Sequence, residues 1–182
     1  MVEYSDKELI ELFQNSDQSE IAFNHIVKRY KERLYWHIRK LIIKHEDTDD
    51  VLQNVFIKVW RGLSNFRGDA GLFTWLYRIA TNEALTFLQQ KRRKFFLPLI
   101  DVESQLENLL ESDEYFNGDE LQLKLQKAIL KLPEKQRVVF NMKYFDELKY
   151  EEISEILQTS VGALKASYHH AVKKIEQYIK VN

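Results

Sequence analysis

The chain has 182 residues, with 27 Lys and Arg, 28 Asp and Glu, two Pro, five Gly and no Cys. So few turn residues exclude a β-sandwich or barrel. The missing cysteines exclude a disulfide framework, a Cys-containing zinc site and a thiol nucleophile. The first residues lack the basic and apolar segments of a secretion signal, and no apolar run reaches the roughly 18 residues of a membrane span. We therefore expect a mostly helical, cytoplasmic protein that does not insert into a membrane.

The net charge of −1 is unevenly distributed along the chain. Residues 1–94 carry a net charge of +3, residues 95–123 hold eight acidic and no basic residues, and residues 124–182 carry +4. Such asymmetry indicates units with different partners. We predict an all-α fold of two small helical domains, residues 1–95 and 120–182, joined by an acidic linker over residues 96–119.

Four helices are predicted in the first block. Residues 5–8 and 17–20 both read as capping boxes, in which a side-chain oxygen accepts an N–H of the first turn while a Glu reaches back. They open one helix through about residue 15 and another, with apolar residues at three- and four-residue steps, through about residue 44. A third helix follows the acidic residues 46–50, and a fourth spans residues 71–94 after a loop.

The rest of the chain predicts shorter helices. A short helix is expected around residues 102–110 of the acidic segment, and four more over about 120–131, 133–145, 150–158 and 161–179. The last two, joined by a tight connection that ends at Ser160, have the pattern of a helix-turn-helix. Ser160 can cap the final helix, and small residues in its first turn allow close approach to the major groove. The alternative is an ordinary helical hairpin with solvated lysines.

Motifs in both blocks resemble those of sigma-70-family factors of the extracytoplasmic-function (ECF) group. In the second block they are residues 132–140, 150–154 and 160–165, and in the first they are residues 49–56 with Trp60, residues 66–69 and residues 73–82. The resemblance implies a transcription initiation factor that binds RNA polymerase core through the beta and beta-prime subunits. It would direct the polymerase to promoter DNA and assist opening of the minus-10 element, with no catalytic residue and no cofactor of its own.

The resemblance also implies three sets of site residues. Those for core-polymerase binding are Asp50, Gln53, Asn54, Phe56 and Trp60. Those for minus-10 DNA are Phe66, Arg67, Asp69, Phe73, Trp75, Arg78, Asn82, Lys91, Arg92 and Arg93. Those for minus-35 DNA are Ser160, Gly162, Ala163, Lys165, Ser167, His169 and Lys173. Aromatic rings can stack on unpaired bases and cations can hold phosphates, whereas the alternative for the aromatic members is packing in the core.

Several features keep an alternative open. By resemblance the acidic linker threads the channel that later carries RNA, whereas composition alone fits a flexible tether. The adjacent His169 and His170 point about 100° apart on a helix, and the other histidines lack ligand spacing, so we expect no metal site.

The resemblance implies an anti-sigma partner. The alternative function is a stand-alone helix-turn-helix regulator with an N-terminal helical regulatory domain, which would read a palindrome as a dimer.

Overall fold

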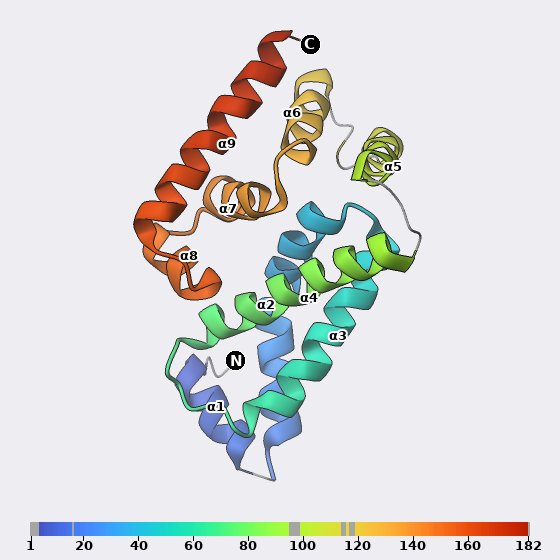
Figure 1. Cartoon of the computed structure of the whole chain (residues 1–182). Helices are drawn as coiled ribbons and strands as arrows, with labels where there is room; N and C mark the ends of the chain where they lie inside the picture. Colours follow the sequence, from blue (N-terminus) through green and yellow to red (C-terminus); the bar gives the residue numbers. More distant parts are fainter. Residues whose placement is uncertain (1–3, 16, 95–98, 114–115, 117–118, 182) are drawn as a thin grey trace.

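The computed structural model describes residues 4–15, 17–94, 99–113, 116 and 119–181, and every regular element in these ranges is a helix (Figure 1). The helices are α1 (Asp6–Gln14), α2 (Ser19–Ile42), α3 (His45–Leu63), α4 (Leu72–Lys94), α5 (Leu99–Ser112), α6 (Glu120–Leu130), α7 (Glu134–Tyr144), α8 (Tyr150–Leu157) and α9 (Val161–Val181). The predicted all-α class is confirmed. In the described part of the chain, no helix is both long and apolar enough to cross a membrane.

The two predicted capping boxes have different outcomes. At α1, the Ser5 hydroxyl accepts the Glu8 N–H while the Glu8 carboxylate accepts the Ser5 N–H. The box over residues 17–20 is wrong, because α2 has Gln18 as its N-cap and no side-chain capping bond. The Gln18 N–H donates instead to the Asn15 carbonyl at 3.0 Å. A tight turn thus follows α1 directly and moves the start of α2 by one residue.

Helices α1 to α4, here called the N-terminal half, pack around a core of buried aliphatic side chains from all four helices. A glycine in α3 sets how closely α4 approaches. A Cβ atom added at Gly62 would lie 2.8 Å from the Trp75 ring. Since real Cβ contacts are never that short, Gly62 allows the indole to lie directly on the α3 backbone.

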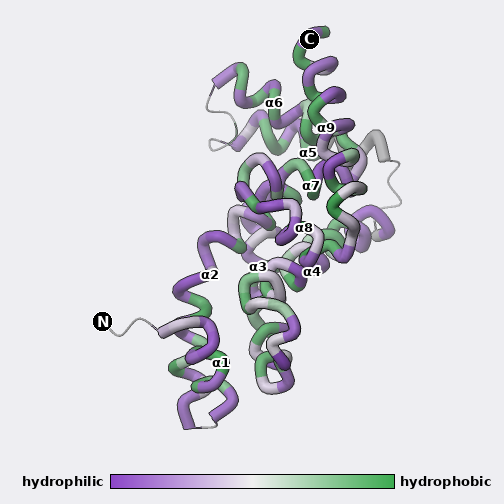
Figure 2. The backbone as a smooth tube through the Cα atoms, turned by 90° about the vertical axis from the view of Figure 1, so that its left-hand side faces the viewer, coloured by the Kyte–Doolittle hydropathy of each residue, from purple (hydrophilic) through white to green (hydrophobic). Residues whose placement is uncertain are grey.

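Helices α6 to α9 form the C-terminal half, in which α6, α7 and α9 share a smaller core formed by Ala128, Ile129, Leu132, Phe140, Ala171 and Ile175. Along α6 and α9, hydrophobic and hydrophilic segments alternate, as expected of amphipathic helices (Figure 2). However, apolar side chains of α7 and α8 also belong to the core of the N-terminal half, among them Val138, Met142 and Ile156. The two halves are therefore in direct apolar contact, with α8 beside α4 (Figure 1).

Helix α5 is longer than predicted and is packed against the rest of the chain. Leu106 and Leu110 form a third apolar cluster with Phe116, Ile43 and Leu130, which joins α5 to the C-terminal end of α2 and to α6. Two ion pairs also join α5 to α6 and the residue after it: Glu111 to Lys127 and Glu107 to Lys131. In this conformation the flexible-tether interpretation of the linker is wrong for residues 106–112.

Candidate functional site

The predicted polymerase-binding residues share helix α3. Four are exposed and one is half-buried, and the set comprises Asp50, Gln53, Asn54, Phe56 and Trp60. Trp60 is 41% exposed. Its ring meets those of Phe13 and Phe23 edge-on, with centroids 5.1 and 4.9 Å away. The indole thus packs on the core with one edge and leaves another edge accessible.

A groove beside these residues runs between α2 and α3. Its apolar wall comprises Phe23, Val27, Leu52, Phe56, Ile57 and Trp60. Ile57, which the sequence analysis missed, is 42% exposed. It lies four residues after Gln53 and three before Trp60, so helical spacing alone could have placed it on the same face. Gln53 also lines the groove, whereas Asp50 and Asn54 do not.

The loop between α3 and α4 carries the first predicted minus-10 residues. Phe66 and Trp75 pack together with ring centroids 4.9 Å apart, while Arg67 and Asp69 are exposed near the tip. Phe73 points elsewhere, because the Arg33 guanidinium lies 4.6 Å from the centre of its ring. The structure therefore groups four of these residues and places Phe73 against α2.

Helix α1 supports this loop from outside. The Gln14 amide donates to the carbonyls of Leu63, at 3.4 Å, and of Phe66, at 3.1 Å. No residue of α1 was predicted to have a functional role. A Gln at the end of a helix that packs beside the loop carries no distinctive pattern, so the sequence offered no signal for it.

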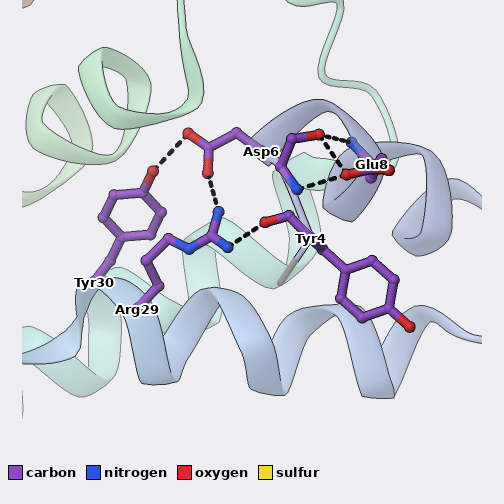
Figure 3. Close-up of polar contacts among 6 residues, drawn as sticks. Tyr4, Asp6, Glu8, Arg29 and Tyr30 are labelled. Atoms are coloured by element: carbon purple, nitrogen blue, oxygen red, sulfur yellow. Dashed lines mark hydrogen bonds and ion pairs between the residues drawn. The ribbon is translucent and has the colours of Figure 1, made fainter. Parts of the chain in front are cut away.

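The position of α1 is fixed at its other end by a polar cluster (Figure 3). The Asp6 carboxylate accepts from Arg29 and from the Tyr30 hydroxyl, both at 2.6 Å, and Arg29 also donates to the Tyr4 carbonyl. Burial, followed by the hydrogen bond to Asp6, raises the pKa of Tyr30. The phenol therefore remains a proton donor, and α1 is anchored to α2 by side chains as well as by apolar packing.

The cations predicted on α4 are mostly engaged within the chain. Arg78 donates to the Glu155 carbonyl of α8 at 2.8 Å, and Arg92 forms an ion pair with Glu134 of α7. Lys91 pairs with Asp47 of α3 at 2.7 Å. Asn82 and Arg93, the remaining members on α4 after Trp75, are exposed.

Except for Ser167, the predicted minus-35 residues lie at the start and along one exposed side of α9. Ser160 accepts the Ala163 N–H at 3.3 Å, which confirms the predicted cap. Lys165, His169 and Lys173 follow one another at four-residue spacing and are exposed, as are Ser160, Gly162 and Ala163. Ser167 is half-buried and faces the groove between the two halves.

A buried polar cluster joins the halves and was not predicted. Asp146, in the connection between α7 and α8, contacts His37 and Lys40 of α2. Burial raises the pKa of Asp146, but the hydrogen bond from His37 and the charges of His37 and Lys40 outweigh this, so its pKa is lowered overall. From the sequence, His37 was only excluded as a metal ligand, because the histidines lack ligand spacing. Within the described residues, no three His, Cys, Asp or Glu side chains are placed to hold a metal ion.

Comparison with known proteins gives a consistent result for both halves. The family model Sigma-70 region 2 matches residues 26–94, and the model Sigma-70, region 4 matches residues 122–175. The RNA polymerase sigma-H factor of Pseudomonas aeruginosa is 30% identical over 99% of this chain and 96% of its own length. The ECF RNA polymerase sigma-E factor of Escherichia coli K12 is 31% identical over 97% of this chain and 95% of its own length.

Two solved structures share the fold. CnrH, in complex with the cytosolic domain of CnrY, superposes with a TM-score of 0.71 and 21% identity over 97% of this chain and 98% of that chain. The sigma factor RpoE of Bartonella quintana, in complex with the anti-sigma factor NepR, gives a TM-score of 0.65 and 19% identity over 88% of this chain and 98% of that chain. Both comparisons support the arrangement of helices.

Proposed function

This chain belongs to the ECF group of the sigma-70 family and is a non-enzymatic transcription initiation factor, and we propose that it acts through three surfaces. One binds the polymerase core, one captures minus-10 DNA and one reads the minus-35 duplex. We further propose that residues 1–95 and 120–182 are its two functional domains. The observation that carries the proposal is that both family models match in order, over parts of the chain that hold the α3 groove and the exposed side of α9.

The α3 groove is the proposed docking site for the polymerase core. Exposed Trp60 and Ile57 supply aromatic and aliphatic contact area, and Gln53 supplies hydrogen bonds beside them. Interfaces commonly rely on a few such anchors surrounded by polar groups. A helix of the partner is the ligand that fits such a groove between two helices.

The loop before α4 is the proposed site for opened minus-10 DNA. The Phe66 and Trp75 pair offers an aromatic surface, and Arg67 offers a cation at the exposed tip. Stacking on aromatic rings offsets the cost of taking a base out of the duplex, which is a few kcal/mol. Asn82 can donate to and accept from a base edge. Phe73 has a supporting role in this proposal, because it packs against Arg33.

The exposed side of α9 is the proposed minus-35 reader. Lys165, His169 and Lys173 lie on one face, and the first turn with Gly162 and Ala163 carries no bulky side chain. That geometry suits entry into the major groove by the helix N-terminus. Phosphate contacts from the lysines position the helix, while its first turns meet the base edges.

An anti-sigma partner, the cellular compartment and the path of the acidic linker complete the proposal. Because two structural neighbours were solved with CnrY and with the anti-sigma factor NepR, we infer that an anti-sigma factor also binds this chain. We place the protein in the cytoplasm, where core polymerase and promoter DNA are found. The acidic linker is proposed to enter the RNA channel of the polymerase once α5 has left α6.

The test is run-off transcription with cognate core polymerase and a promoter library, followed by sequencing of the transcripts. Promoter-specific initiation is expected only when the chain is added. The paired change Gln53→Ala with Asn54→Ala should weaken core binding, measured by fluorescence anisotropy, while leaving binding of isolated duplex DNA unchanged. Gln177→Ala on the exposed side of α9 is the matched control, because it removes the same amide far from α3.

Transcripts that start at random sites would contradict the proposed initiation function. Equal loss of core binding in the Gln53/Asn54 variant and in the Gln177→Ala control would contradict the assignment of α3. A Trp75→Ala variant separates the DNA steps, since permanganate footprinting of unpaired thymines should show less opening while initial promoter binding persists.

A further inference from the structure

The corner between α2 and α3 holds an arginine that is buried beneath the acidic linker. Arg39, in the last turn of α2, is 3% exposed. Its guanidinium forms an ion pair with the carboxylate of Asp113, just after α5, and lies 5.0 Å from the centre of the Phe116 ring. Arginine is almost never buried so deeply unless it is paired. One side chain of α2 thus binds an anion and an aromatic ring at the same time.

The linker presents these two groups together. The Phe116 N–H donates to the Asp113 carbonyl at 3.1 Å, and the Asp113 N–H donates to the Leu110 carbonyl at 3.4 Å. Two turn hydrogen bonds after α5 therefore bring the carboxylate and the ring to the same arginine. Leu106 and Leu110, four residues apart on α5, pack beside the ring. The docked segment is recognised by an apolar helix face, a carboxylate and an aromatic ring.

The floor of this site has a strained backbone. Ile43, directly after α2, has φ 70° and ψ −47°, a conformation that β-branched residues rarely adopt. Its side chain is 1% exposed and belongs to the cluster with Leu106, Leu110 and Phe116. Such strain persists only where the surrounding structure enforces it, and it is concentrated in ligand clamps and switch regions. The backbone of Ile43 therefore indicates a corner built for contact.

The linker does not satisfy Arg39 completely. The Nη2 atom of Arg39 contacts Asp113, whereas Nη1 is buried and has no hydrogen-bond acceptor within the described part of the chain. A buried donor without an acceptor is unfavourable. A planar guanidinium can bind a carboxylate through two parallel hydrogen bonds while it stacks on a ring. A segment that supplies a second acceptor would therefore bind Arg39 more tightly than the linker does.

We propose that Arg39 and Ile43, here called the α2–α3 corner, form a docking site for a protein partner that presents an acidic and an aromatic residue about one helical turn apart. The free chain fills this site with its own linker, so the linker and the partner exclude each other. The apolar side chain of Ile43 favours a protein segment over nucleic acid. That the site becomes vacant during initiation rests on the proposed function, in which the linker enters the polymerase, whereas the chemistry of docking does not.

The test uses a fluorescein-labelled peptide that copies residues 104–118, together with full-length Phe116→Ala, whose linker lacks the ring that holds it in the corner. Fluorescence anisotropy should show that the peptide binds this variant. Binding to the wild-type chain should be roughly tenfold weaker, as expected if the linker fills the site about nine-tenths of the time. Where Phe116→Ala loses helicity by circular dichroism, Asp113→Asn weakens the linker contact instead.

A second substitution connects peptide binding to the corner. Adding Arg39→Lys to Phe116→Ala should weaken peptide binding roughly fivefold, since lysine keeps the charge but loses the planar group and about one hydrogen bond. The matched control is Arg61→Lys, the same change at an exposed site near the other end of α3, which should have no effect. Equal binding by the Arg39→Lys and Arg61→Lys variants contradicts the assignment of the site.

Selection of random peptides displayed on phage against Phe116→Ala tests the kind of partner. The enriched peptides should carry Asp or Glu three or four residues from Phe, Tyr or Trp, and the linker peptide should displace them. Enriched peptides without an acidic residue overturn the proposal. So does a single-stranded oligonucleotide that displaces the linker peptide, because it assigns the corner to nucleic acid.

The outcomes for the docking site and for the proposed function are distinguishable. Peptide binding requires neither polymerase nor DNA, so absence of promoter-specific transcription counts against the proposed function alone. Absence of peptide binding to both Phe116→Ala and Asp113→Asn overturns the docking site, whatever the transcription assay gives.

Discussion

At the scale of single residues, Gln158 lies in the turn of the helix-turn-helix and has an unfavourable backbone conformation there. It is the C-cap of α8 with φ 52° and ψ 45°, the left-handed conformation. A residue with a Cβ atom is disfavoured there, whereas glycine adopts it freely. We predict that Gln158→Gly raises the free energy of unfolding by about 0.5–1 kcal/mol. Urea denaturation measures it, with Gln177→Gly in the interior of α9 as a control that should instead destabilise.

Gln14 supports the proposed minus-10 loop through two carbonyl groups. Gln14→Glu keeps the size of the side chain but removes its donors, so we predict faster amide hydrogen exchange over residues 64–71. A lost hydrogen bond of about 1 kcal/mol corresponds to roughly fivefold less promoter opening. Core binding should be unchanged, because Gln14 lies outside the α3 groove. The exposed Gln18→Glu adds the same charge nearby, and an equal effect there would show that charge, not support of the loop, is responsible.

Residues also differ in how far sequence alone could place them. The cap at Ser160 and the exposed row through Lys165 follow from local spacing, which a helix determines by itself. His37 and Asp146 are 109 positions apart. Their contact depends on how the two halves pack, and no local pattern encodes that. For the same reason, Phe73 could not be separated from Trp75 before the neighbouring α2 was known.

At the scale of helices, the extent of α5 shows where composition is a weak guide. The sequence predicted only a short helix, over about residues 102–110 of an acidic linker, whereas α5 spans Leu99–Ser112. Within it, the carboxylates of Glu107 and Glu111 pair with lysines on and just after α6. The apolar side of α5 finds a partner in Ile43, at the corner between α2 and α3. Helix starts and ends are otherwise close to those predicted, because caps and apolar periodicity act locally.

Phe116 is the residue whose loss should release α5. It is fully buried in the cluster with Leu106 and Leu110, and the Arg39 guanidinium lies 5.0 Å from its ring centre. Truncating a buried Phe commonly costs about 3–5 kcal/mol, so we predict that Phe116→Ala removes protection from hydrogen exchange over residues 106–112.

Protection elsewhere should distinguish release of α5 from general unfolding. Helices α2 to α4 keep their own core, so their amides should remain protected in Phe116→Ala. Tyr144→Ala, at a half-exposed ring on α7, is the control and should leave α5 protected. Persistent protection of residues 106–112 in Phe116→Ala would mean that the ion pairs to Lys127 and Lys131 suffice to hold α5.

At the scale of the whole molecule, near-neutral net charge conceals opposed parts. The family assignment gives a reason for the near-zero net charge. A subunit that acts when bound to its polymerase is better served by weak binding of the free chain to DNA. Two basic parts and one acidic part also attract one another within a chain. The ion pairs of Asp113 with Arg39 of α2 and of Glu111 with Lys127 of α6 show this attraction in the packed form.

The packing of the halves should depend on pH through Asp146. Its carboxylate faces His37 and Lys40 from α2 and, more distantly, Tyr77 from α4. Its pKa is lowered in the packed form, and it returns toward the usual value of about 3.9 when the halves separate. Protons therefore bind the separated form more tightly. The contribution of Asp146 to packing is full above about pH 4 and is lost as the pH falls through the lowered pKa.

Spin labels at Glu32→Cys on α2 and Gln177→Cys on α9, both exposed positions, allow pulsed electron paramagnetic resonance to measure the distance between the halves. This distance should lengthen on acidification, starting below about pH 4. Far-UV circular dichroism at each pH identifies the range in which the helices remain formed, and only that range is compared. In Asp146→Asn the lengthening should already be present at neutral pH and should change little with acid, because the titrating group is gone. A wild-type response that persists unchanged in Asp146→Asn would assign the acid sensitivity to other carboxylates, such as Glu134 in its pair with Arg92.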